Sequence, residues 1–375
     1  MIDNKIPLSI DNRNLYLKKN EKFKLLYDDL NNFLSDEKYI KNKDFTEHLW
    51  FSNEIKFNNT IEGYKDDVEL ISSVIKDNNR SISYKKRKRI INLFRGYQYI
   101  LKNKDINKET LKNLYNILSK GLLDESDLKH MGKYYREDRV FIYFSSNIDI
   151  IPDEGIEFNK IDEYMNNLFE YINKNKGDNQ TDNFIISQII HFYFVYIHPY
   201  FDINGRTSRT LSMWYLLNNN SEPYIIFNRG IPYKINDYYK IIKETKYHHN
   251  LTYFINYMME TIKKELEKEY IIDMVEQNYG SELDIINRQT IHQILSMNGI
   301  LSLIDFTTFY NHYNTKIKTL DAYKKLILPL LELNILDYDR STKKNITPHM
   351  NNFTFKINEK KLDFDKSKIK YIKLK

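Results

Sequence analysis

The chain of 375 residues contains no cysteine, which excludes disulfide bonds and thiolate chemistry. No apolar run approaches membrane-spanning length without a charge. Residues 1–10 carry Asp3, Asn4 and Lys5 in place of the apolar core of a signal peptide. No His-Glu-x-x-His pattern is present, so a zinc hydrolase of that kind is unsupported. We therefore expect a cytoplasmic protein that does not engage a membrane.

The composition is typical of a globular protein with a sizeable core. Apolar residues make up 41% of the chain, and 31 tyrosines supply much of their bulk. The length favours more than one domain. A formal net charge of +6 is modest for this size, so it neither requires nor excludes a nucleic-acid partner.

One stretch, residues 198–209 (HPYFDINGRTSR), concentrates groups that can carry chemistry. The apolar residues 184–197 before it predict a buried helix, and residues 206–217 after it predict a second helix. Unpaired N–H groups and the helix dipole make the start of a helix a binding site for phosphate. The stretch therefore predicts a phosphate site between two helices.

The side chains of this stretch suit that prediction. Arg206 and Arg209 lie three positions apart, share a helix face and can reach successive phosphates. Asp202 is a hard oxygen ligand for Mg²⁺, and His198 is the obvious proton acceptor. The residue types by themselves indicate a nucleotide-phosphate site with a base.

The same stretch resembles the signature of the Fic family, His-Pro-Phe-x-(Asp/Glu)-Gly-Asn-(Gly/Lys)-Arg-x-x-Arg. The matching positions are His198, Pro199, Asp202, Asn204, Gly205, Arg206 and Arg209. Tyr200 stands where phenylalanine is usual, and Ile203 stands where glycine is usual. If the backbone at Ile203 requires φ > 0, a β-branched residue there would be strained.

The resemblance implies a mainly α fold, with a Fic-type helical core and a small β-hairpin flap. It implies a protein adenylyltransferase that transfers AMP from ATP, with Mg²⁺, to a Ser, Thr or Tyr hydroxyl of a protein. In that reading His198 is the catalytic base and Asp202 holds the metal. The residues expected to bind the nucleotide are Asn204, Gly205, Arg206, Thr207, Arg209 and Tyr238.

Residues 57–63 (FNNTIEG) resemble the inhibitory helix that one class of Fic proteins carries, (Ser/Thr)-x-x-x-Glu-(Gly/Asn). Asn58 takes the Ser/Thr position. The resemblance implies that Glu62 pairs with Arg209 and thereby occupies the arginine needed for the γ-phosphate. The alternative is an exposed glutamate at a helix end followed by Gly63.

Residues 132–136 (GKYYR) and 140–144 (VFIYF) interrupt the helical pattern, and the second segment predicts a strand. They resemble the flap of Fic proteins, which follows a Gly-x-Tyr-Arg pattern, with one additional residue before Arg136. An exposed strand edge can bind an extended target segment through main-chain hydrogen bonds. An ordinary hairpin without a ligand is the alternative.

We expect three parts: residues 1–105 with the inhibitory motif, 106–275 as the Fic core, and 280–375 as a winged-helix-like domain. Further helices are predicted at 21–34, 107–118, 156–173, 260–275, 283–297, 303–313 and 320–334, with an N-cap at Thr181 or Asp182 for the buried helix. Strands are predicted at 335–338 and 353–357. The basic residues 84–89 predict the solvated start of an amphipathic helix rather than a nucleic-acid patch.

Two alternatives stay open beside protein AMPylation with autoinhibition by Glu62. A Fic enzyme could use another nucleotide or phosphate donor, although Gly205 favours AMP transfer over the lysine-containing variant that phosphorylates. Alternatively, the protein is a transcriptional regulator whose Fic core senses nucleotide. The third helix of its C-terminal domain would then bind DNA, with Lys324 and Lys325, and Lys343 and Lys344 in the wing. Self-modification is expected, and a homodimer is left open.

Overall fold

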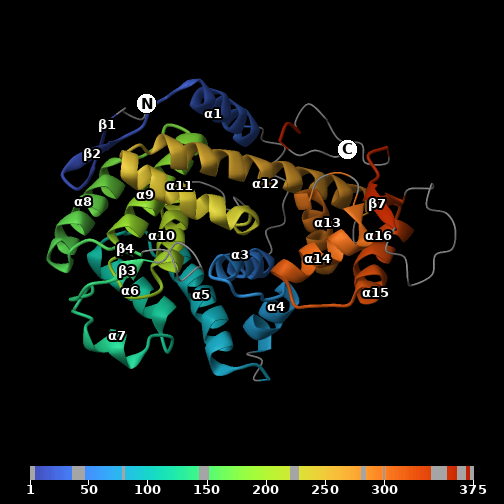
Figure 1. Ribbon diagram of the computed structural model, residues 1–375, viewed down its shortest axis with the longest axis horizontal. Coiled ribbons are helices and arrows are strands. Elements are labelled where there is room, and N and C mark those ends of the chain that lie inside the picture. Colours follow the sequence, from blue (N-terminus) through green and yellow to red (C-terminus); the bar gives the residue numbers. More distant parts are fainter. Residues whose placement is uncertain are drawn as a thin grey trace. The chain divides into compact units, whose positions relative to one another are not determined.

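Figure 1 shows a computed structural model of the chain. The structure describes residues 5–35, 47–77, 81–142, 152–219, 228–279, 284–297, 299, 301–338, 353–360 and 369–371. The chain divides into two compact units, residues 1–62 with 71–262, and residues 63–70 with 263–375. Helices predominate, as the resemblance predicts. The three-part division by sequence pattern stays a prediction.

The first unit holds the candidate site. Its strands are β1 (Lys5–Ile10), β2 (Arg13–Tyr16), β3 (Phe141–Ile142) and β4 (Asp153–Glu154). Its helices are α1 (Glu21–Leu34), α3 (Glu47–Ile61), α5 (Tyr84–Lys102), α6 (Lys108–Ser119), α7 (Glu125–Lys129), α8 (Ile161–Lys174), α9 (Gln180–Ile197), α10 (Asn204–Asn218) and α11 (Ile235–His248). Two further helices, α4 (Val68–Asp77) and α12 (Thr252–Tyr279), contribute residues to both units.

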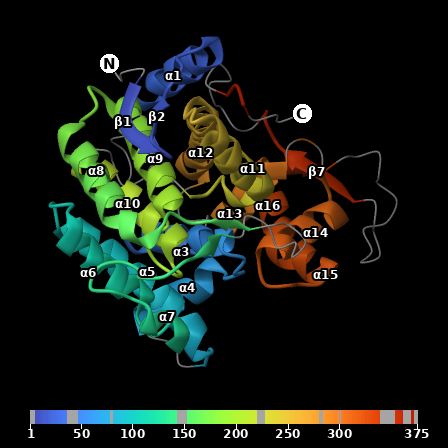
Figure 2. The ribbon, with the colours of Figure 1, turned by 60° about the vertical axis from the view of Figure 1, so that its left-hand side comes forward.

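Helix α9 is the centre of this unit. It packs against α10, α8 and α1, and Figures 1 and 2 show it beside α10. Nearly every residue of α9 is buried, so its many β-branched residues remain helical because packing on all sides overrides their strand preference. Asn179 caps the helix by accepting the N–H of Asp182, so the predicted cap at Thr181 or Asp182 is wrong.

The structure contains an N-terminal β-hairpin that the sequence analysis did not predict. Strands β1 and β2 pair antiparallel through a two-residue turn at Asp11 and Asn12, which have φ values of 46° and 62°. Left-handed values at both turn residues match the right-handed twist of the strands, and Asn and Asp tolerate them. The alternating apolar residues Ile6, Leu8 and Ile10, which are the buried residues of β1, were the signal in the sequence.

Several predicted bounds need correction. The helix predicted at 156–173 begins as a 3₁₀ turn at Phe158–Lys160 and continues as α8. The strand predicted at 140–144 is reduced to β3, and residues 143–144 lie outside the described residues. Strand β3 pairs antiparallel with β4, so the predicted hairpin is present.

The second unit contains α13 (Ile285–Met297), α14 (Leu303–Tyr313), α15 (Thr319–Ala322), a π-helical segment (Tyr323–Ile327) and α16 (Leu328–Glu332). Its strands β5 (Leu301–Ser302), β6 (Leu336–Tyr338) and β7 (Thr354–Ile357) form an antiparallel sheet in the order β5-β7-β6.

The helix predicted at 320–334 is interrupted, because Pro329 lacks the N–H that an α-helix needs there. The N–H of Leu328 reaches back five residues to Tyr323, which makes the π segment. Lys324 and Lys325 are exposed on that segment, whereas Lys343 and Lys344 lie outside the described residues. Within the described part of the chain, no helix is long and apolar enough to cross a membrane.

Candidate active site

The loop between α9 and α10 is fixed by two residues with left-handed backbones. His198 ends α9 with φ 50° and ψ 59°, and Ile203 precedes α10 with φ 67° and ψ 7°. A non-glycine residue in this region costs about 1–3 kcal/mol, and Ile203 is β-branched. The strain foreseen at Ile203 is therefore present. Thr207 offsets it by donating its backbone N–H and hydroxyl to the Ile203 carbonyl, at 2.9 and 2.8 Å.

Asn204 closes this loop. Its amide nitrogen donates to the carbonyl of Tyr200 at 2.7 Å, and its amide oxygen accepts the N–H of Tyr200 at 3.0 Å. Tyr200 is buried and stacks on Tyr115 of α6 with ring centroids 3.5 Å apart. The side chains of Asn204 and Thr207, both predicted to bind nucleotide, are thus engaged in shaping the loop.

His198 has the properties of a base. Burial lowers the pKa of its imidazole to about 4, against a smaller raising effect of the Val195 carbonyl. The ring is therefore neutral at physiological pH. Its Nδ1 lies 3.3 Å from that carbonyl, which can only accept, so Nδ1 carries the proton. The other nitrogen, Nε2, is left as the acceptor.

Arg209 has a buried guanidinium with two hydrogen-bond partners. One partner lies in α3, and the other directly follows that helix. The Nε of Arg209 donates to the side-chain amide oxygen of Asn58 at 3.0 Å, and its Nη2 donates to the Glu62 carboxylate. The side chains of Arg209 and Glu62 are 2% and 27% exposed. Burial alone raises the pKa of Glu62, but Arg209 and Arg206 outweigh it, so the pKa is lowered. Glu62 is therefore a carboxylate within the site.

Gly205 shows where that carboxylate lies. A Cβ built on Gly205 would lie 2.7 Å from Glu62 Oε1 and 3.1 Å from Arg209 Nη1. Because Gly205 lies in the first turn of α10, the carboxylate sits at a helix N-terminus, where unpaired N–H groups and the dipole favour an anion. A protein anion therefore occupies the place that the sequence predicted for phosphate.

Arg206 and Asp202 lie on the same loop. Arg206 is buried, and its Nη2 is 3.8 Å from Oδ1 of Asp202, whose side chain is 56% exposed. Its Nε–H finds no hydrogen-bond partner within the described part of the chain. A buried donor without a partner is costly, so an anionic ligand would satisfy this arginine.

The residues fit a metal that arrives with a substrate. Among the described residues, no group of three or more His, Asp or Glu side chains could hold an ion. Mg²⁺ commonly uses one or two carboxylates and completes its shell with phosphate oxygens and water. The exposed carboxylate of Asp202, beside a helix N-terminus, suits that mode.

Tyr238, in α11, is buried against α9. It is 2% exposed, and its hydroxyl pairs with Nε2 of His191 at 2.9 Å. The neighbouring Tyr239 is only partly buried, and its hydroxyl lies 3.5 Å from the carbonyl of Ile61, next to Glu62. Tyr239 is thus the more accessible ring of the pair. The sequence reading missed it, along with His191.

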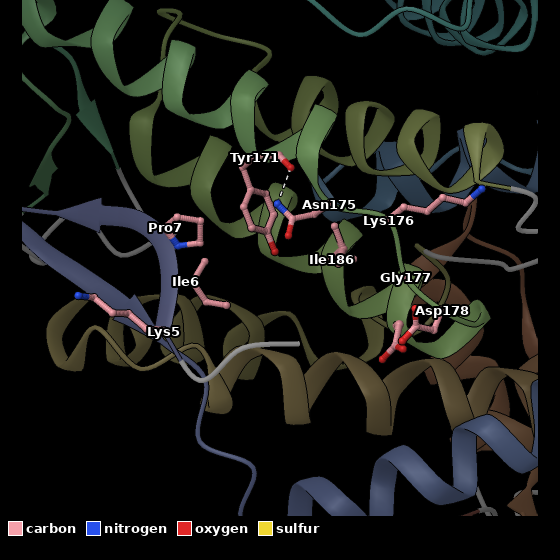
Figure 3. A pocket seen from close by; sticks show the side chains of 10 residues that line it. Lys5, Ile6, Pro7, Tyr171, Asn175, Lys176, Gly177, Asp178 and Ile186 are labelled. Carbon is pink, nitrogen blue, oxygen red and sulfur yellow. Dashed lines mark hydrogen bonds between the residues drawn. The ribbon is translucent and has the colours of Figure 1, made fainter. Parts of the chain in front are cut away.

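A pocket of about 140 Å³ lies elsewhere in this unit, beside β1 and the first turn of α9. Figure 3 shows the Tyr171 hydroxyl between Ile6 and Ile186. Asp182, which also lines it, precedes His198 by 16 residues, or about 24 Å of α-helix. The pocket is therefore separate from the loop that carries His198.

Sequence comparison identifies the domain that contains this loop. The sequence model of the Fic/DOC family matches residues 105–216, from the start of α6 through most of α10. Residues 105–216 therefore resemble a Fic/DOC family domain. The family is known for modifying proteins by nucleotide transfer. No curated protein matches the chain.

One solved structure with a similar fold covers nearly the whole chain, and two further structures match less of it. A Fic family protein from Desulfovibrio desulfuricans G20 is 16% identical, covers 94% of this chain and 97% of its own, and has a TM-score of 0.58. A Fic-1 fragment from C. elegans is 14% identical over 68% of this chain and 73% of its own (TM-score 0.48). A Fic domain containing signaling protein from Bacteroides thetaiotaomicron VPI-5482 is 13% identical over 66% and 96% (TM-score 0.47).

Proposed function

We propose that this protein is an adenylyltransferase that moves AMP from ATP to a Ser, Thr or Tyr hydroxyl of a protein. The observation that carries the proposal is the Glu62 carboxylate, seated against Gly205 and Arg209 at the start of α10. A site that already holds one oxyanion, beside a neutral imidazole, suits a phosphate chain and an attacking hydroxyl.

We propose a separate role for each of these residues. The backbone at Gly205 and the start of α10 would bind the α-phosphate. Arg206, with its unpartnered buried Nε–H, would neutralise the leaving pyrophosphate, and Arg209 would hold the γ-phosphate once Glu62 has moved. Asn204 and Thr207 would serve the nucleotide through the loop shape that they maintain.

The chemical step is a displacement at phosphorus. The target hydroxyl oxygen forms a bond to the α-phosphorus while the bond from that phosphorus to the bridging oxygen of pyrophosphate breaks. The hydroxyl proton passes to Nε2 of His198, and pyrophosphate leaves with the electron pair. Positioning and electrostatic stabilisation supply most of the acceleration in such transfers. When Mg²⁺ is bound to Asp202, it would supply charge neutralisation between the phosphates.

Glu62 would make the protein autoinhibited. A carboxylate that occupies the γ-phosphate position must leave before ATP binds in line for transfer. Both Arg209 contacts come from the α3 segment, so displacement of that segment would free the arginine. Asn58, at the position where the family pattern has Ser or Thr, would add a second restraint on Arg209.

The test is incubation of the purified protein with Mg²⁺ and ATP labelled at the α-phosphate, with self-modification as the readout. We expect weak labelling of the parent, strong labelling of Glu62→Gly, and none of Glu62→Gly combined with His198→Ala. Label from γ-labelled ATP would instead indicate phosphorylation. Absence of label from both donors in the Glu62→Gly protein would contradict the proposal.

DNA binding and dimerisation remain predictions. Lys324 and Lys325 are exposed in the second unit, as DNA binding would require. A filter-binding titration of the full chain at two salt concentrations, with Lys324→Ala and Lys325→Ala as variants, would test the regulator alternative. Steep salt dependence that both substitutions weaken would favour it.

A further inference from the structure

Arg136 joins the catalytic loop to the hairpin. The residue is 1% exposed, and its guanidinium donates to three main-chain carbonyl groups. Nε reaches the carbonyl of His198 at 2.9 Å, Nη1 that of Asp138 at 2.6 Å, and Nη2 that of Ile156 at 2.5 Å. Its own N–H donates to the carbonyl of Pro199 at 3.0 Å. One residue therefore fixes two consecutive carbonyls of the loop.

The other two carbonyls bracket the hairpin. Asp138 precedes β3 and Ile156 follows β4, so the same guanidinium holds both ends of the β3–β4 pair. The chain is tightly packed where it leaves β4. A Cβ on Gly155 would lie 2.6 Å from Val140 Cγ1 and 3.0 Å from Arg136 Nη2. The position of the hairpin relative to His198 is therefore set at Arg136.

The chemistry requires arginine. Three carbonyl oxygens in different directions suit a planar fork with five donors, whereas a lysine ammonium is a compact point charge. Within the described part of the chain, no carboxylate lies within ion-pair distance of Arg136. Burial accordingly lowers the pKa of the guanidinium to about 10, although it remains a cation at physiological pH. Asp138 and Glu154 act against this lowering but do not cancel it, so the three carbonyl groups are the direct partners that hold the cation.

His198 benefits in two ways. The hydrogen bond from Arg136 Nε holds the carbonyl of a residue whose left-handed backbone is itself unfavourable. The nearby guanidinium also disfavours protonation of the imidazole, adding to the effect of burial. Both effects keep Nε2 fixed and unprotonated.

We propose that Arg136 is a positioning residue that sets the distance between the β3–β4 hairpin and His198, so that a hydroxyl on a target segment paired with the hairpin edge meets Nε2. The inference rests on the proposed transfer and extends it from the nucleotide to the acceptor. A strand edge supplies main-chain hydrogen bonds to an extended segment whatever its sequence. Arg136 then determines where along that edge a hydroxyl can react.

The first test compares Arg136→Lys with Arg139→Lys, both in the Glu62→Gly protein. The control applies the same substitution to Arg139, an exposed arginine three residues further along the chain. Its Nε lies 3.6 Å from Oε1 of Glu154. We expect self-labelling from α-labelled ATP to slow at least tenfold in Arg136→Lys and less than twofold in Arg139→Lys. The Kd of ATP should change less than twofold in both, because the hydrogen bonds of Arg136 go to main-chain carbonyl groups and not to the side chains proposed to bind the nucleotide. Equal labelling rates, or a parallel loss of ATP affinity, would overturn the proposal.

A second variant guards against misfolding of the first. Gly155→Ala leaves Arg136 intact but forces the hairpin return away from Nη2. It should reproduce the slower labelling with unchanged ATP affinity. Parent-like labelling in a folded Gly155→Ala protein would count against a positional role.

A third measurement is independent of transfer. Hydrogen exchange at the amides of Gly155 and Arg136, which donate to the carbonyls of Val140 and Pro199, reports the hairpin and its tie to the loop. We expect exchange at both amides to be at least tenfold faster in Arg136→Lys than in the parent. In Arg139→Lys the exchange rates should equal those of the parent. If the Glu62→Gly protein labels nothing, the proposed function fails, and unchanged exchange in Arg136→Lys would separately refute the role of Arg136.

Discussion

Replacement of Glu62 by glycine should strengthen ATP binding and weaken the ligand-free protein at the same time. Loss of one partner from a fully buried ion pair costs about 3–5 kcal/mol, and loss from an exposed pair about 0–1 kcal/mol. The Arg209 side chain is 2% exposed and that of Glu62 27%, so we place their contact between these limits, at roughly 1–3 kcal/mol. ATP bound at the proposed site would have to replace this contact in the parent.

The two effects have measurable sizes. Since about 1.4 kcal/mol corresponds to a tenfold change in Kd, Glu62→Gly should bind ATP roughly 5–150-fold more tightly. Without ATP, Arg209 is left buried without its carboxylate, and Tm should fall by about 2–4 °C for each kcal/mol lost. Saturating ATP should restore the difference, because the phosphate replaces the carboxylate.

Calorimetric titration with ATP and Mg²⁺ measures the first effect, and thermal unfolding with and without ATP measures the second. Glu62→Gln is the graded control, since it removes the charge but keeps a hydrogen-bond acceptor for Arg209; it should fall between parent and Glu62→Gly. A Kd within twofold of the parent in Glu62→Gly, together with an unchanged Tm, would refute the reasoning.

Three other perturbations test separate parts of the site. His198→Ala should abolish AMP transfer while changing the Kd of ATP less than twofold, as measured by labelling and calorimetry; retained labelling would remove the base role. Gly205→Ala should be less destabilising in the Glu62→Gly background than in the parent, because its Cβ meets Glu62 Oε1; additive losses of unfolding free energy in a double-mutant cycle would contradict this placement. Burial raises the pKa of Glu54 to about 7, so the folded state binds the extra proton and the stability from that proton is lost as pH rises from about 4.5 through 7. The difference in unfolding free energy between Glu54→Gln and the parent should therefore shift in favour of Glu54→Gln when the pH is raised from 5 to 8. Denaturant unfolding at the two pH values measures this difference, and a difference that does not change with pH would contradict the prediction.

The sequence was informative where chemistry and periodicity coincide. Helices α1 and α14 have the predicted bounds, because apolar spacing and capping residues agree there. The loop was predicted as a phosphate site from residue types, and the structure places Gly205 and Arg209 beside the carboxylate of Glu62. The Ile203 backbone was foreseen because φ > 0 is a local property that a glycine position in a pattern reveals.

Other features depend on tertiary contacts that no local pattern encodes. Arg136 was noticed only as part of a short motif, since its three carbonyl partners come from segments up to 62 residues away. The burial of Tyr238 against His191 is equally non-local, so the sequence could not distinguish it from Tyr239. The side chains of Asn204 and Thr207, which are predicted to bind nucleotide, also form hydrogen bonds within the loop that a pattern match cannot reveal.

The central claim is that this site transfers AMP rather than phosphate and does so through His198. The most direct measurement follows label from α-labelled and γ-labelled ATP, in parallel, into the Glu62→Gly protein and into the same protein with His198→Ala. The account predicts protein-bound label from the α donor alone, and only when His198 is present. Label from the γ donor, or α label that survives His198→Ala, would contradict it.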